Sequence, residues 1–121
     1  MDTRSKILTA DAALALSERP LAIAAGLFDV LRVAHVRELQ KTRTSCAAAA
    51  LLVVVLPCAS GWLSQSARAE LVAALRVVDY VMAGGAEELA ALVQVLAPAC
   101  VMDLHDLDVS LRQELKERVG Q

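Results

Sequence analysis

Short apolar runs alternate along this chain with segments whose apolar residues recur at helical spacing. The longest run covers residues 48–56 and contains Val53, Val54 and Val55, so neither face of a strand here would be polar. A strand of this kind is typical of the centre of a parallel sheet covered by helices on both faces. Three shorter runs predict further strands at residues 21–25, 77–82 and 99–103.

Helical patterns fill the gaps between these runs. The predicted helices are residues 9–17 with Thr9 or Asp11 as the cap, 34–41, 66–76 with Ser66 as the cap, 86–96, and 108–119 with Asp108 as the cap. In the third of them Leu71 and Leu75 share an apolar face, and Arg68 is expected on the solvated face. The alternation predicts a single α/β domain of Rossmann-like type over residues 1–121, with a parallel sheet of four to five strands and helices on both faces.

Composition narrows the classes of partner. The 121 residues are 57% hydrophobic and 21% charged, enough for a buried core, and the formal net charge is -2. Lys and Arg are scattered along the chain, and aromatic residues make up only 2%. A nucleic-acid partner needs a basic surface and rings for stacking, so we expect none, and we expect no anionic lipid surface either.

A membrane-spanning segment is the alternative interpretation of the long apolar run. Residues 44–67 contain no charged side chain. The strongly apolar part is only about half of the roughly 20 residues that a spanning helix needs, and Pro57, Ser60, Gly61, Ser64 and Gln65 interrupt the remainder. We therefore favour a buried strand followed by a polar loop, with no membrane association.

The cysteines and the N-terminus indicate a cytoplasmic protein. Cys46, Cys58 and Cys100 are odd in number and have no Cys-x-x-Cys spacing, which favours reduced thiols in the core over a disulfide framework or a zinc site. Asp2, Arg4, Lys6 and Asp11 precede any apolar run long enough for a signal peptide.

A motif follows the first predicted strand. It comprises Gly26, then Phe28-Asp29, and then His35 at the start of a helix. This arrangement resembles the signature of the nucleotidyltransferase superfamily that includes heptose-phosphate adenylyltransferases and glycerol-3-phosphate cytidylyltransferases, in which a glycine turn is followed by Phe-Asp and His-x-Gly-His. Residues 6–9, 68–75 and 78–81 are similar to further segments of those domains, in the same order.

The resemblance implies a ligand site beyond the carboxyl ends of the strands and a reaction, transfer of a nucleotidyl group from a nucleoside triphosphate to a sugar or polyol phosphate. It assigns His35 and Arg32 as catalytic residues. It further assigns a nucleotide-binding role to Gly26, Phe28, Asp29 and Arg68. Mg²⁺ would be the cofactor of an active enzyme. Family likeness, with the apolar surplus of a small chain, also favours a homodimer.

Several departures from the family pattern favour weakened or lost activity. Arg32 stands where the first signature histidine is expected, and Ala34 replaces the motif glycine. The loop at residues 56–62 has no lysine, and residues 103–108 are acidic where the family has a phosphate-binding turn of serine and threonine. The alternative function is therefore a non-catalytic homologue that binds a nucleotide or a protein.

The same acidic segment suggests a separate hypothesis of a hard-metal site. Asp103, His105, Asp106 and Asp108 are ligand types for Mg²⁺ or Zn²⁺. Their spacing matches no defined metal motif, and a resident metal is not our prediction. As ordinary structure, such residues suit the start of a helix.

Overall fold

The computed structural model describes residues 3–58, 62–109 and 113, which form a parallel sheet of four strands in the order β3-β2-β1-β4. The strands are β1 (Leu21–Gly26), β2 (Ala50–Val55), β3 (Tyr80–Ala83) and β4 (Cys100–Asp103). The helices are η1 (Thr3–Lys6), α1 (Ala10–Leu14), α2 (Val33–Ser45), α3 (Gln65–Ala73) and α4 (Ala86–Leu96), and residues 105–109 are also helical. The predicted Rossmann-like fold is confirmed.

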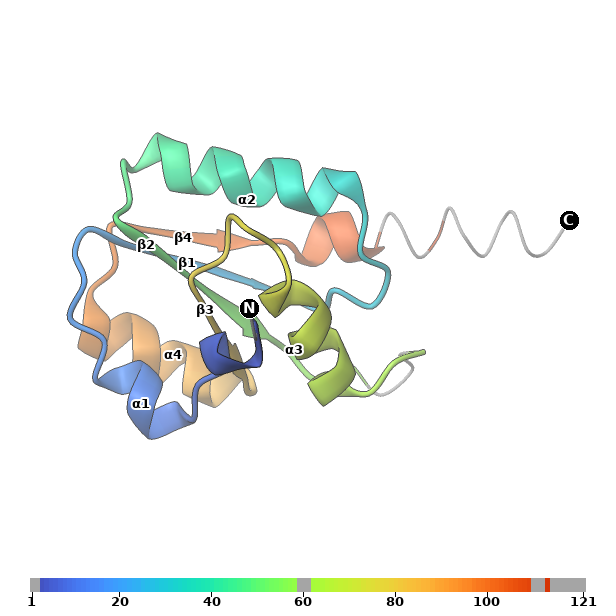
Figure 1. The fold of residues 1–121 in the computed structure, drawn as a ribbon, viewed down its shortest axis with the longest axis horizontal. Coiled ribbons are helices and arrows are strands. Elements are labelled where there is room, and N and C mark those ends of the chain that lie inside the picture. The colour runs from blue at the N-terminus through green and yellow to red at the C-terminus, as the bar shows by residue number, and fades with distance from the viewer. Residues whose placement is uncertain (1–2, 59–61, 110–112, 114–121) are drawn as a thin grey trace, which may run out of the picture.

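Helices cover both faces of the sheet (Figure 1). Alternate residues of β1 and β2 enter two separate cores, one built with residues of α2 and α3 and the other with residues of α1 and α4. Every residue of β1 and β2 is buried. The prediction of a central, two-sided apolar strand at β2 is therefore confirmed, since β2 lies between β3 and β1.

Several predicted element ends were wrong, among them those of the first three helices. The cap of α3 is Ser64, whose Oγ accepts from the Ala67 amide at 3.1 Å, and Ser66 lies inside the helix. The second helix continues to Ser45 because Leu39 and Thr42 keep a buried face beyond the first two turns. The first helix ends at Leu14.

Asp108 is not a helix cap. It lies within the helical residues 105–109, and the His105 amide donates instead to Asp103 Oδ1 at 2.9 Å. The residue Asp108 is only 2% exposed, and its side chain faces the end of β1. The sequence predicted that the Asp108 carboxylate would cap its own helix. It instead accepts a hydrogen bond from the segment that follows β1.

The prediction of reduced thiols is wrong for two of the three cysteines. Cys46, at the end of α2, and Cys100, at the start of β4, form a disulfide across a separation of 54 residues. Cys58 is not part of this disulfide. The cytoplasmic prediction consequently loses the support that it drew from reduced thiols.

No helix within the described part of the chain is long and apolar enough to cross a membrane.

The strand order fixes where a ligand site can form. The chain runs outward from β1 through β2 to β3, and then returns so that β4 pairs with the other side of β1. The carboxyl ends of β1 and β4 thus adjoin where the strand order reverses, the position at which open α/β sheets bind ligands.

Candidate functional site

A tight turn lies at the carboxyl end of β1, next to the position where the strand order reverses. Phe28 has a φ of 52°, in the left-handed region that bulky residues rarely adopt. The turn directs two successive backbone amides at one carboxylate: Leu27 N donates to Asp108 Oδ2 at 2.8 Å, and Phe28 N donates to Asp108 Oδ1 at 3.2 Å. The carboxylate of Asp108 is thereby held at the carboxyl end of β1.

His35 supplies a third contact to the same carboxylate. Its Nε2 lies 2.8 Å from Asp108 Oδ1, and its Nδ1 accepts from the backbone amide of Arg32 at 3.1 Å. Because Nδ1 is an acceptor, the ring proton is assigned to Nε2, which donates to Asp108. His35 is fully buried, and the reach of its side chain back to the residue that precedes α2 resembles half of a capping box.

Gly26 is required by the close approach of this carboxylate. A Cβ atom at Gly26 would lie 2.9 Å from Asp108 Oδ2, 3.1 Å from Phe28 Cε2 and 3.2 Å from Leu104 Cβ. The ring of Phe28 in turn packs against the His35 ring, with centroids 5.3 Å apart. Gly26, Phe28 and His35 are therefore parts of one packed unit around Asp108.

We expect Gly26→Ala to lower the free energy of unfolding by about 1–3 kcal/mol, because a methyl group would be forced against a buried carboxylate and a buried ring. Urea denaturation followed by circular dichroism measures this. Gly84→Ala is the matched control, since its closest neighbour is Met82 Cε, the flexible end of a side chain. An equal loss in both variants would show a general cost of replacing glycine and would contradict the proposed close approach.

Arg68 was expected on the solvated face of its helix, and this is wrong, because it is only 1% exposed. One guanidinium nitrogen, Nη1, donates to the carbonyls of Leu27 at 2.5 Å and Leu56 at 2.7 Å, and Nε donates to Leu63 O at 3.3 Å. The Leu27 residue is thus held from two sides, its carbonyl by Arg68 and its amide by Asp108. These contacts join the ends of β1 and β2 to the start of α3.

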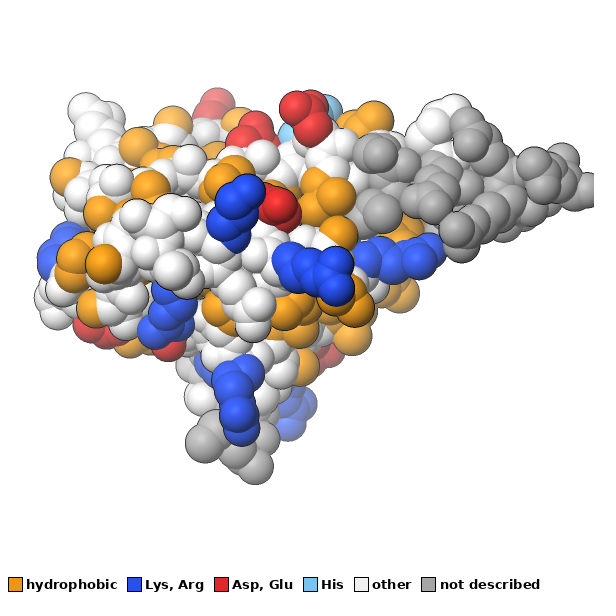
Figure 2. Space-filling model, turned by 90° about the horizontal axis from the view of Figure 1, so that it is seen from above, with side chains coloured by type: hydrophobic (Ala, Val, Ile, Leu, Met, Phe, Trp, Pro, Cys, Tyr) orange, Lys and Arg blue, Asp and Glu red, His pale blue; other side chains and the backbone are white. Residues whose placement is uncertain are grey.

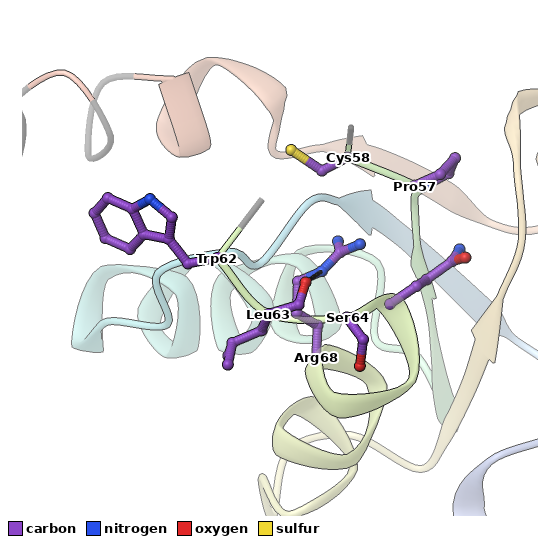
Figure 3. A pocket seen from close by; sticks show the side chains of 7 residues that line it. Pro57, Cys58, Trp62, Leu63, Ser64 and Arg68 are labelled. Carbon is purple, nitrogen blue, oxygen red and sulfur yellow. Dashed lines mark hydrogen bonds between the residues drawn. The ribbon is translucent and has the colours of Figure 1, made fainter. Parts of the chain in front are cut away.

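A hollow of about 450 Å³ lies beside Arg68, between the end of β2 and the start of α3 (Figure 3). Its lining residues are Pro57, Cys58, Trp62, Leu63, Ser64, Gln65 and Arg68. Trp62 is 59% exposed, and its indole points away from Arg68. The Trp62 amide donates to Asp29 Oδ1 at 2.8 Å, so Asp29 connects the loop after β1 with the loop after β2.

The predicted site residues therefore separate into two groups. Gly26, Phe28 and His35 come together around Asp108, whereas Asp29 and Arg68 hold neighbouring loops. Arg32 precedes α2 with an exposed side chain. Their catalytic and nucleotide-binding roles stay predictions. Sequence reasoning missed Asp108 as a member of the site, although the acidic segment at residues 103–108 was the signal that could have indicated it.

The surface and the acidic segment show how charge is distributed. Lys and Arg side chains are spread among hydrophobic and uncharged ones over the face that α2 covers (Figure 2). Within residues 3–58, 62–109 and 113, no group of three or more His, Cys, Asp or Glu side chains is placed to hold a metal ion. Asp103, His105, Asp106 and Asp108 are accordingly not gathered into one ligand group, because Asp108 turns inward to His35.

The sheet order and its covering helices define the chain as a Rossmann-like α/β domain. Among solved structures, the lipopolysaccharide core biosynthesis protein from Thermoplasma volcanium GSS1 is similar, with a TM-score of 0.57 and 22% identity over 67% of this chain and 70% of that chain. A likeness at this identity is a likeness of fold. No protein-family model matches the chain, and no curated protein matches it.

Proposed function

We propose that this chain is a cytidylyltransferase-like domain in which nucleotidyl transfer is weak or lost. The single observation that carries the proposal is the position of Asp108, whose carboxylate accepts from two backbone amides and His35 at the carboxyl end of β1. The two amides and His35 could otherwise stabilise phosphate oxygens, but they already donate to the Asp108 carboxylate.

The reaction under test is the attack of a sugar or polyol phosphate oxygen on the α-phosphorus of a nucleoside triphosphate, with release of pyrophosphate. Its catalysis depends mainly on positioning and on the neutralisation of phosphoryl charge. His35 would be the remaining signature histidine. The exposed Arg32 stands at the position of the missing one. The similar protein from Thermoplasma volcanium is a lipopolysaccharide core biosynthesis protein. A sugar phosphate as the acceptor substrate of this chain is compatible with that likeness.

Mg²⁺ would be the cofactor of any turnover. The described carboxylates do not fit a metal held by the protein, because Asp108 is occupied by three N–H donors and no described cluster is available. Mg²⁺ is therefore expected only together with the triphosphate.

Pyrophosphate release by the unmodified protein tests the proposal, with ATP, CTP, GTP and UTP, Mg²⁺, and a panel of sugar and polyol phosphates. We expect release near the uncatalysed background, because the loss of a single phosphate-stabilising donor commonly costs about 100 to 1,000-fold in rate. The matched variant Arg32→His/Ala34→Gly restores the family signature and should improve nucleotide affinity more than turnover. Turnover by the unmodified protein at about 1 per second or faster would contradict the proposal.

A protein-binding role is the second candidate. Val33, Trp62 and Leu63 are 64%, 59% and 40% exposed in the segments that follow β1 and β2. Calorimetric titration with ATP and CTP, with and without Mg²⁺, separates the two candidates. Saturable binding favours a nucleotide-binding domain, whereas no heat with either nucleotide favours protein binding.

A further inference from the structure

Two successive amides converge on Asp108 at the end of β1. The left-handed Phe28 lies at the centre of this turn, and the amides of Leu27 and Phe28 reach different oxygens of the carboxylate, at 2.8 and 3.2 Å. Successive N–H groups arranged in this way form a nest, a concavity that binds anions in many phosphate sites. The carboxylate of Asp108 occupies the nest as a bound anion would.

The side chain of His35 completes a cradle of three N–H donors, defined by Leu27 N, Phe28 N and His35 Nε2. The contact from Arg32 N to Nδ1 assigns the donated proton to Nε2, as described above. His35 is fully buried, and Phe28 and Asp108 are 1% and 2% exposed. Buried donors strongly require an acceptor, because an unmet one carries its full desolvation cost.

We propose that this cradle is an anion site of the phosphate class, which Asp108 fills from within the chain. Inorganic phosphate is expected to bind there once the carboxylate is removed, since its oxygens can accept from the same three donors. Gly26 leaves room beside the anion, because its missing side chain would have been 2.9 Å from Asp108 Oδ2. The inference rests on the proposed function only for the choice of phosphate as the ligand.

The experiment is a titration of Asp108→Ala with sodium phosphate at fixed ionic strength, with the melting temperature as the readout. The substitution removes the internal anion and leaves the three donors. At a tenfold excess over its Kd, phosphate should raise the Tm of Asp108→Ala by about 5 °C. The unmodified protein, whose cradle is filled, should shift by less than about 1 °C under the same conditions.

Two controls make the result specific. Asp106→Ala removes the same charge from an exposed position in the same helical segment and should show no phosphate-dependent shift. Asp108→Ala/His35→Ala lacks one donor and should bind phosphate about tenfold more weakly. Equal shifts in Asp106→Ala and Asp108→Ala, or in Asp108→Ala and the unmodified protein, would overturn the inference.

If Asp108→Ala does not fold, Asp108→Ser takes its place, because the shorter side chain keeps one acceptor and still vacates most of the cradle. The absence of a saturable phosphate-dependent shift in the folded variant would overturn the proposal. No nucleoside triphosphate is present in this titration. Failure here and failure of the pyrophosphate experiment are therefore distinguishable: the first concerns the cradle and the second concerns nucleotidyl transfer.

Discussion

Arg68→Met is expected to lower the free energy of unfolding by about 3 kcal/mol or more. The substitution removes a buried charged donor, and the backbone carbonyls that accept from it lose their hydrogen-bond partner. Methionine approximates the length of the arginine stem but donates no hydrogen bond. The carbonyls of Leu27 and Leu56, which accept from Nη1 at 2.5 and 2.7 Å, belong to the ends of two neighbouring strands. Urea denaturation of both proteins by circular dichroism gives the difference.

Two comparisons separate this effect from a general loss of charge. Arg76→Met removes an exposed arginine that follows the same helix and should change stability by no more than about 0.5 kcal/mol. Arg68→Lys keeps the charge but cannot serve the carbonyls with a planar fork, so an intermediate loss is expected. A loss below about 1 kcal/mol in Arg68→Met would show that water readily replaces the guanidinium and that the site is less closed than described.

Arg68 also shows where pattern analysis of a helix fails. A single arginine among alanines at helical spacing predicts a solvated side chain, because most arginines are exposed. Its partners, the carbonyls of Leu27 and Leu56, lie 41 and 12 residues away in the chain. Which carbonyls lack partners at the ends of strands depends on how loops pack, and the helical period carries no information about that.

The sheet could be predicted because its signal is local and strong. Residues of β2 are apolar on both faces, and only a covered central strand accommodates such a run without exposing it. Helix caps were less predictable, since Ser64 and Ser66 are chemically equivalent and the choice depends on where the first helical turn begins.

The sequence predicted one part of the candidate site and missed the other. Gly26, Phe28 and His35 belong to one short motif, and the turn between β1 and α2 brings them together locally. Asp108 lies 73 residues beyond His35, and their pairing depends on the return of the chain that places β4 beside β1. The sequence indicated that carboxylates at residues 103–108 would oppose a triphosphate, but the sequence could not indicate that one of them occupies the cradle itself.

The disulfide between Cys46 and Cys100 is expected to stabilise the folded chain by about 2–4 kcal/mol, because it closes a loop of 54 residues in the unfolded state. It also joins the end of α2 to β4, which among the described strands pairs with β1 alone. Urea unfolding in the presence and absence of a reductant measures the contribution in the background Cys58→Ser, where no third thiol can exchange with the bond.

The double variant Cys46→Ala/Cys100→Ala is the control, and its unfolding midpoint should not respond to the reductant. Comparison of oxidised and reduced forms of one chain keeps the packing of the sulfur atoms nearly constant, so the difference reports the covalent link rather than the loss of two buried side chains. Equal midpoints with and without reductant in Cys58→Ser would show that the two sulfurs are thiols in solution. Cys46 and Cys100 would then be reduced, and β4 would be held by its hydrogen bonds to β1 and by core packing without a covalent link to α2.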